Sequence, residues 1–170
     1  MLDLAKISDL FAQRKTGHAL PQALYNDPDV FEFDLLAIYG QSWLLMGLEC
    51  ELPKAGATLA MNIGPWPIVV VRGRDGTLRA FHNSCRHRGA QICKTGHGSS
   101  PRLVCPYHKW TYELTGELVS APRMAEDFEK NDHGLTPIAI EVLEGAVHIC
   151  LSDNPPSFDE YRAKAGPLMA

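Results

Sequence analysis

The hydrophobic pattern predicts two short helices near the N-terminus. Apolar residues recur at helical spacing over residues 3–15, which indicates an amphipathic helix. A second helix is predicted to begin after Asp27, a suitable N-cap, because Pro28 fits the first helical turn and acidic residues follow it. The apolar residues that share one face of the first helix are Leu4, Ile7, Leu10 and Phe11.

From Ser42 onward the apolar residues come in short β-rich runs that glycine and proline separate. The first four runs are SWLLMGLE, ATLAMNIG, WPIVVVRG and LRAFHNS. With almost no helix between such runs, the pattern predicts a mainly β fold of antiparallel sheets, either a sandwich or a barrel-like arrangement. Three hairpins are expected, with turns at Asp75-Gly76, Thr115-Gly116 and Glu144-Gly145.

These elements divide the chain of 170 residues into three parts. A helical lead-in is expected over residues 1–41 and the β-rich domain over residues 42–152. Past Ser152 the sequence contains two consecutive prolines, which predicts a linker over residues 153–170 that enters a helical turn.

Composition and charge narrow the classes of function. Hydrophobic residues make up 45% of the chain and charged residues 21%, the balance of a globular protein. The net charge of -4 argues weakly against a nucleic-acid partner, since phosphate binding favours a basic face. No apolar run approaches the roughly 20 residues that a membrane span needs. Asp3 and Asp9 interrupt the first apolar residues, unlike a secretory signal, so we expect a cytoplasmic protein without a membrane partner.

Two Cys/His pairs, in the pattern C-x-H-x17-C-x2-H, carry the most specific chemistry of the sequence. Cys85 and His87 form the first pair, and Cys105 and His108 form the second. Each pair follows a predicted strand, so two neighbouring loops are expected to bring the four side chains together at one end of the sheet. Thiolate with imidazole suits zinc or an iron–sulfur cluster.

The spacing distinguishes these two metals. A Cys2His2 zinc site usually pairs cysteine with cysteine and histidine with histidine, and C-x-H is an uncommon zinc spacing. A Rieske two-iron, two-sulfide cluster has two cysteines on one iron and two histidines on the other. One residue of each type in each loop therefore favours the Rieske cluster, with a zinc-binding structural module as the alternative.

The sequences CRHRGA and CPYHKW resemble the cluster motif of the Rieske oxygenases, the large subunits of ring-hydroxylating dioxygenases and of N- or O-demethylases. The likeness extends from about LPQALYNDPDVFEFD to NPPSFDEY, which is most of the chain. Within the family, LPQALY, NSCRHRGAQIC and HGLTPIAIEV are most similar to the oxygenase components of glycine betaine and proline betaine demethylases. The resemblance implies a Rieske iron–sulfur fold whose cluster is held by Cys85, His87, Cys105 and His108.

The resemblance also implies a larger oxidoreductase. In the family, electrons pass from an NAD(P)H-dependent flavin/iron–sulfur reductase or a ferredoxin, through the Rieske domain, to a mononuclear Fe(II) that activates O2 for hydroxylation or N-demethylation. That iron lies in a C-terminal domain that this sequence does not supply, so the chain is expected to be part of an oxygenase subunit. The second histidine, which matches His108, approaches a carboxylate of a neighbouring subunit in a ring-shaped homotrimer. The alternative is a stand-alone Rieske ferredoxin-like electron carrier.

Four residues beside the ligands are expected to support the cluster. Trp110 matches the family's H-x-W pattern and is expected to pack over the cluster, and Arg88 is expected to support the first loop. Gly89 allows that loop to turn tightly. Tyr107 is expected either to donate its hydroxyl towards sulfur or to be an exposed surface residue.

The remaining cysteines are interpreted as structural. Rieske proteins of respiratory complexes join their cluster loops by a disulfide, but Tyr107 stands where the second-loop cysteine would be needed. Cys93 is therefore expected to be a free, partly buried thiol, and Cys50 and Cys150 to be small core residues.

Basic residues flank the two loops of an otherwise acidic chain. They are expected to attract an acidic redox partner, although ordinary solvated surface charge explains them equally well. These residues are Arg72, Arg74, Arg86, Arg88, Lys94, Arg102 and Lys109.

Overall fold

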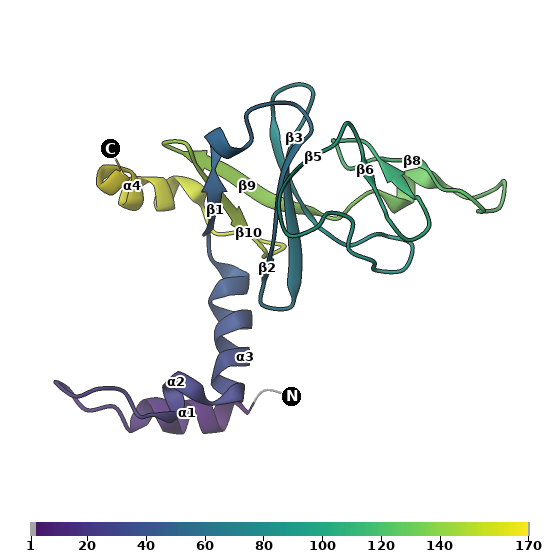
Figure 1. Cartoon of the computed structure of the whole chain (residues 1–170). Coiled ribbons are helices and arrows are strands. Elements are labelled where there is room, and N and C mark those ends of the chain that lie inside the picture. The colour runs from purple at the N-terminus through teal and green to yellow at the C-terminus, as the bar shows by residue number, and fades with distance from the viewer. Residues whose placement is uncertain (1–2, 170) are drawn as a thin grey trace.

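The computed structural model describes residues 3–169, which form two antiparallel sheets with helices at both ends (Figure 1). The larger sheet contains β1 (Leu44–Leu48), β2 (Ala57–Ile63), β3 (Trp66–Arg72), β4 (Leu78–His82), β5 (Gly96–Ser99), β9 (Pro137–Leu143) and β10 (Ala146–Cys150), in the order β1-β10-β9-β4-β3-β2-β5. The smaller sheet has the order β6-β7-β8, with β6 (Leu103–Val104), β7 (Thr111–Tyr112) and β8 (Leu118–Ser120). All of these pairings are antiparallel, which confirms the predicted fold class.

The three predicted hairpins are confirmed. β3 pairs with β4, β7 with β8, and β9 with β10, each across the expected turn. In the first turn the Asp75 carboxylate accepts the Thr77 N–H at 3.1 Å and two hydrogen bonds from the Arg79 guanidinium, at 2.9 and 2.7 Å. At the second turn a Cβ on Gly116 would lie 2.5 Å from the Phe81 ring, so only glycine lets the small sheet approach β4 this closely.

β3 separates two hydrophobic cores because its apolar run is buried on both faces. Ile68 and Val70 face one core, which the strands of the large sheet enclose among themselves. Val69 and Val71 face the other, which the large and small sheets enclose together. Both cysteines of the motif belong to this second core. Because side chains alternate along β3, Val69 and Val71 lie in the same core as the two cysteines of the loops.

The helices differ in part from the prediction. The first, α1, is confirmed over Leu4–Ala12 but ends before residue 15, and Asp27 caps α3 (Pro28–Ala37) as expected. The remaining helical segments are the short α2 (Ala23–Asn26), the 3-10 turns η1 (Tyr39–Gln41), η2 (Glu49–Glu51) and η3 (Lys130–His133), and α4 (Phe158–Met169). The last forms three turns where a single helical turn is predicted, since its first residue Phe158 packs against Trp43 at a ring distance of 4.8 Å.

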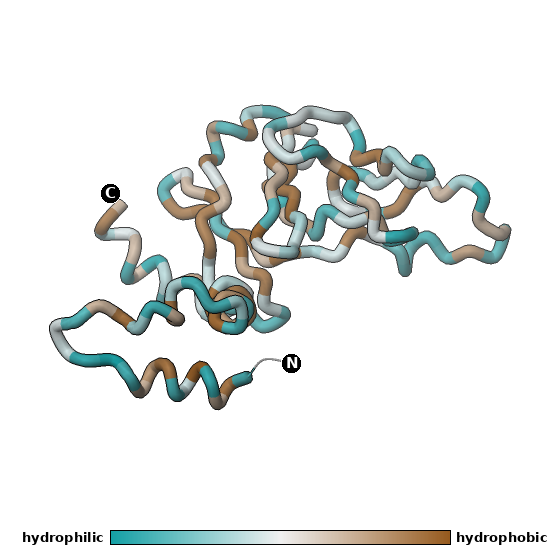
Figure 2. Tube along the Cα trace, turned by 60° about the horizontal axis from the view of Figure 1, so that its bottom comes forward, coloured by the Kyte–Doolittle hydropathy of each residue, from teal (hydrophilic) through white to brown (hydrophobic). Residues whose placement is uncertain are grey.

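The N-terminal helices form an arm that projects from the large sheet (Figure 1). Lys6 joins α1 to the start of α3, with hydrogen bonds of 2.9 Å to Asp27 and 2.7 Å to Asp29. Figure 2 shows hydrophobic positions along both legs of this arm, where Tyr25 and Phe31 are largely exposed. Among residues 3–169, no helix has the length and hydrophobicity that crossing a membrane demands.

Candidate metal centre

The two Cys/His loops are closed by the same pair of backbone hydrogen bonds. In the first, the Cys85 N–H donates to the Ala90 carbonyl at 2.9 Å, and the Gly89 N–H donates to the Cys85 carbonyl at 2.8 Å. In the second, the equivalent bonds are Cys105 N–H to the Trp110 carbonyl at 2.8 Å and Lys109 N–H to the Cys105 carbonyl at 3.1 Å. In both loops the cysteine N–H therefore bonds to the carbonyl five residues later, and the cysteine carbonyl accepts the N–H four residues later.

A left-handed residue completes each loop four positions after the cysteine. Gly89 has φ of +69° and Lys109 has φ of +63°. Glycine adopts this left-handed conformation readily. Lys109 adopts it at a cost of about 1 kcal/mol, because its side chain disfavours a positive φ. The shared conformation is what makes both loops turn back towards the same point.

A buried asparagine fixes the base of the first loop. The Asn83 side chain is 0% exposed, and its Oδ1 accepts the Ile92 N–H at 3.2 Å and the Cys93 N–H at 2.8 Å. Its Nδ2 donates to the Cys93 carbonyl at 2.8 Å. Three hydrogen bonds from one side chain hold both ends of the loop together.

The four residues of the motif meet where the loops meet. The rings of His87 and His108 lie 4.7 Å apart at the edge of the molecule, and both are half-buried. Cys85 and Cys105 are buried beneath them, close enough for each sulfur to act on the other. Thiols therefore gather on the core side and imidazoles on the surface side.

The chemistry of these donors fits a bound metal group. The Nδ1 of His108 is buried without a hydrogen-bond partner, a costly state that coordination removes. Burial, then the neighbouring His87, Arg88 and Arg123, lowers the pKa of His108, which favours the neutral imidazole that a metal requires. Burial also raises the pKa of the Cys85 thiol, so its thiolate needs a nearby cation.

The donors do not fit a compact site for one ion. Among residues 3–169, no three or more His, Cys, Asp or Glu side chains converge as a single metal ion requires. A tetrahedral zinc needs four ligands around one point, whereas a two-iron cluster takes only two protein ligands per iron. The preference for a cluster over zinc therefore rests on the Cys/His spacing of the two loops.

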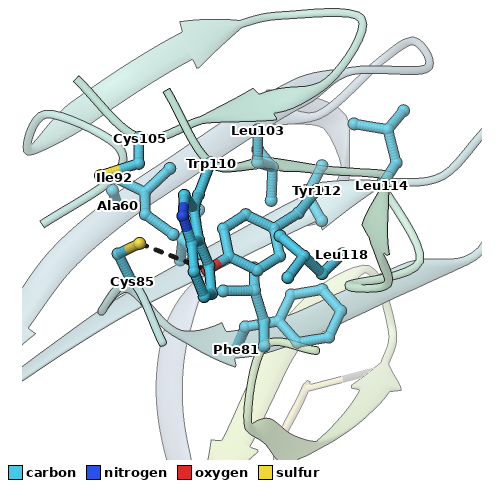
Figure 3. Packing of buried hydrophobic residues seen from close by; sticks show 13 residues of the cluster. Ala60, Phe81, Cys85, Ile92, Leu103, Cys105, Trp110, Tyr112, Leu114 and Leu118 are labelled. Carbon is cyan, nitrogen blue, oxygen red and sulfur yellow. Dashed lines mark hydrogen bonds between the residues drawn. The ribbon is translucent and has the colours of Figure 1, made fainter. Parts of the chain in front are cut away.

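The hydroxyl beside the cysteine sulfur belongs to Tyr112 rather than to Tyr107. Tyr112 is fully buried, and its oxygen lies 3.3 Å from the Cys85 sulfur and accepts the Arg86 N–H at 3.1 Å (Figure 3). Because the oxygen already accepts one bond, its own proton is available to the sulfur. Tyr107 is 63% exposed, and its ring lies 3.8 Å from that of His108.

Trp110 lies directly beneath the histidine of the first loop. Its side chain is 1% exposed, and its ring stacks on His87 at 4.9 Å with an interplanar angle of 10°. Phe128 and His133, from the segment after β8, pack on the other sides of the indole at 5.4 and 5.9 Å. Together these rings exclude water from the inner side of the loops.

The expected basic residues divide into two groups. Three form ion pairs away from the histidines: Arg72 with Glu49 at 3.0 Å, and Arg74 and Arg102 with Glu113, both at 2.7 Å. The remaining four are exposed, and Arg88 lies close enough to His108 to act on its pKa. They are Arg86, Arg88, Lys94 and Lys109.

The three other cysteines differ in environment. Cys93 is a free, partly buried thiol, as predicted, and burial raises its pKa to about 11, so it stays protonated at neutral pH. Cys150 is buried in the core as predicted. The prediction for Cys50 is wrong: it lies in the exposed turn η2, where the chain leaves β1.

Residues 42–144 match the family of the Rieske [2Fe-2S] domain, which is more than half of the chain. The chain belongs to this family, and the family implies a two-iron, two-sulfide cluster in it.

Individual relatives are oxygenase subunits. The chain is 45% identical over 164 residues to the glycine betaine monooxygenase oxygenase subunit of Chromohalobacter salexigens, across 96% of this chain and 37% of that protein. It is 37% identical over 164 residues to biphenyl 2,3-dioxygenase subunit alpha of Rhodococcus jostii, across 95% of this chain and 35% of that protein. The chain thus spans little more than a third of the length of these curated relatives.

A solved structure shows the same architecture. The apo form of the quaternary ammonium Rieske monooxygenase CntA superimposes with a TM-score of 0.81 at 30% identity, across 88% of this chain and 44% of that chain. The described residues therefore correspond to less than half of that chain too.

Gly89→Ala is expected to lower the free energy of unfolding by about 1 kcal/mol, because alanine is strained at a positive φ. The new Cβ would meet only the Ser84 hydroxyl oxygen, at 3.7 Å, so the backbone rather than a clash is the cause. Gly76→Ala is the matched control, since Gly76 has φ of +79° and open space around it. Urea denaturation should show similar losses for both variants, with iron content reduced only for Gly89→Ala. Unchanged stability of Gly89→Ala would contradict the left-handed conformation of Gly89 in this loop.

Tyr112→Phe is expected to lower the reduction potential of the iron-loaded protein by tens of millivolts, roughly one hydrogen bond to a charged acceptor. The hydroxyl next to the Cys85 sulfur stabilises the more negative, reduced state, and phenylalanine removes it without changing the ring. Potentiometric titration measures the change. Tyr107→Phe is the control and should leave the potential unchanged. The opposite result, a shift only in Tyr107→Phe, would assign the role to the exposed tyrosine.

Proposed function

We propose that this chain is the Rieske electron-transfer domain of an oxygenase component, with Cys85, His87, Cys105 and His108 as the cluster ligands. This ligand set is supported most directly by two loops that meet and that have the same backbone hydrogen bonds. There the two imidazoles lie 4.7 Å apart, and a buried histidine nitrogen lacks a partner. The cluster, when bound, would supply a one-electron redox centre at this edge of the molecule.

The chain's own residues would hold, orient and shield that centre. Asn83 holds the first loop closed, and Trp110 supports the His87 ring and keeps water from the inner side. Tyr112 holds a proton towards the Cys85 sulfur. Arg88, Gly89 and Trp110 are proposed as supporting residues in the roles given above, while Tyr107 covers the outer face of His108.

The whole protein is proposed to be an oxygenase subunit. It would receive electrons from an NAD(P)H-dependent flavin/iron–sulfur reductase or a ferredoxin and deliver them to a mononuclear Fe(II) in a separate catalytic domain, for O2-dependent hydroxylation or N-demethylation. The relatives reported above are oxygenase subunits, which gives no support to a stand-alone carrier. Higher identity to the glycine betaine subunit than to the biphenyl subunit favours a quaternary amine as substrate.

The proposed partners and assembly rest on two surfaces. The exposed cations Arg86, Arg88 and Lys109 lie around the histidine edge and suit an acidic reductase or ferredoxin. The apolar side chains on the helical arm, which include Tyr25 and Phe31, are typical of a protein interface and support a homotrimer. The division into residues 1–41, 42–152 and 153–170, and a cytoplasmic location, complete the proposal.

Ligand replacement tests the centre. After anaerobic reconstitution with iron and sulfide, wild-type protein should be red-brown, contain two irons per chain, and show a reduction potential within the Rieske range of about −150 to +300 mV. His87→Ala and His108→Ala should each lose most of the iron. His97→Ala is the control, because that exposed histidine bonds to Glu51 instead. A colourless protein with one bound zinc would overturn the proposal.

The size of the native gene product tests the oxygenase assignment. Immunoblotting of the native cell extract with an antibody against the Rieske region should detect a chain more than twice the length of this one, since the relatives extend well beyond the matched region. That product, supplied with a reductase, NADH and glycine betaine, should consume O2. A native product of only this length would instead support the electron carrier.

A further inference from the structure

Two buried side-chain nitrogens within residues 3–169 lack a hydrogen-bond partner, and both lie at the two loops: His108 Nδ1 and Trp110 Nε1. Coordination accounts for the histidine atom, since a neutral imidazole nitrogen is a metal ligand. It does not account for the indole, which can only donate a hydrogen bond. An unpaired buried donor costs about 1–3 kcal/mol, so the atom requires an acceptor.

The position of the indole limits what that acceptor is. One ring face stacks on His87, and Phe128 and His133 pack edge-on around it. None of these three side chains forms a hydrogen bond with the indole nitrogen. Figure 3 shows the indole nitrogen on the edge of Trp110 that is turned towards the Cys85 and Cys105 side of the core. The nearby Tyr112 hydroxyl is already engaged with Cys85 and Arg86.

Trp43 shows how another, less buried indole of this protein is satisfied. Its Nε1 donates to the Pro156 carbonyl at 2.9 Å, a bond within the chain that holds the segment before α4. Trp110 has no such carbonyl, although it is among the most deeply buried side chains of the described residues. The contrast indicates that the acceptor of Trp110 lies outside the described residues.

We propose that the indole N–H of Trp110 donates a hydrogen bond to a sulfur acceptor of the bound cluster, so that Trp110 is a positioning residue that raises the reduction potential. The inference rests on the proposed ligand set. A donor aimed at sulfur stabilises the reduced state, which carries one more negative charge, and pairing removes the orphaned donor from the core. Stacking against His87 keeps the N–H in a fixed direction.

Replacement of the N–H without loss of the ring tests the proposal. In reconstituted protein, Trp110→Phe should lower the reduction potential, with a shift of about tenfold in the redox equilibrium constant, or ~59 mV for one electron. Because phenylalanine also leaves a gap, 3-benzothienylalanine at position 110 serves as a second variant: sulfur replaces the N–H in a ring of nearly the same shape. It should lower the potential by a similar amount while retaining wild-type iron content.

Trp43→Phe is the matched control, since it removes an indole N–H at the opposite end of the molecule and should leave the potential unchanged. Pulsed EPR of reduced wild-type protein labelled with 15N at the indole nitrogen supplies an independent readout. A nitrogen coupling should be present in wild type and in Trp43→Phe and absent in Trp110→Phe.

The outcomes separate this inference from the proposed function. A wild-type protein with a Rieske spectrum, but with the same potential in the benzothienylalanine variant and no indole coupling, overturns the role of Trp110 alone. A wild-type protein without a Rieske spectrum overturns the ligand set and this inference with it.

Discussion

Burial of two cysteines on an apolar core is the constraint on which the rest of this molecule depends. Cys85 and Cys105 belong to the core that the two sheets enclose, together with Val69 and Val71 of β3. A thiolate in such a place is unfavourable, and burial accordingly raises the pKa of Cys85. The fold therefore offers sulfur ligands at a position where only a bound cation makes their ionised form stable, and it couples cluster binding to the packing of both sheets.

The two loops solve one geometric problem twice with different residues. Each must bring its cysteine inward and its histidine outward within a few residues, and each does so with the same pair of backbone hydrogen bonds and one left-handed residue. Their histidines differ, at two and three positions after the cysteine, and the second loop accepts the strain of Lys109. Strain of this kind persists where surrounding structure enforces it, and the buried Trp110 that follows provides that enforcement.

Much of this could be predicted from the sequence because local chemistry determines it. The hairpin turns contain glycine at the required positions, Asp27-Pro28 begins a helix, and the spacing of cysteine and histidine distinguishes a cluster from zinc. Other features depend on distant residues. β5 contains two glycines and no apolar run, and it exists because β2 offers it a free edge. The length of α4 depends on its packing against Trp43.

The residues around the Cys85 sulfur also divide into those that local sequence predicts and those that depend on distant contacts. Tyr107 is adjacent to a ligand in sequence, whereas Tyr112 reaches Cys85 across the core. One signal for Tyr112 was present: it is the last residue of β7 and lies two residues after Trp110, and alternation along an extended chain puts both side chains on one face. No such signal exists for Asn83, because a buried amide with three backbone partners is indistinguishable in sequence from a polar loop residue.

The two sides of the candidate metal centre also differ in their exposure to solvent. The cysteine side of the centre is enclosed by core residues, Trp110 and Tyr112, while the histidine side reaches the surface among exposed cations. With the proposed ligands, electrons would enter or leave the centre through the imidazole edge rather than through either sheet. The small sheet lies at the end of the molecule opposite α4, and away from the helical arm (Figure 1). The surface proposed for the redox partner and the surfaces proposed for assembly are therefore separate parts of this domain.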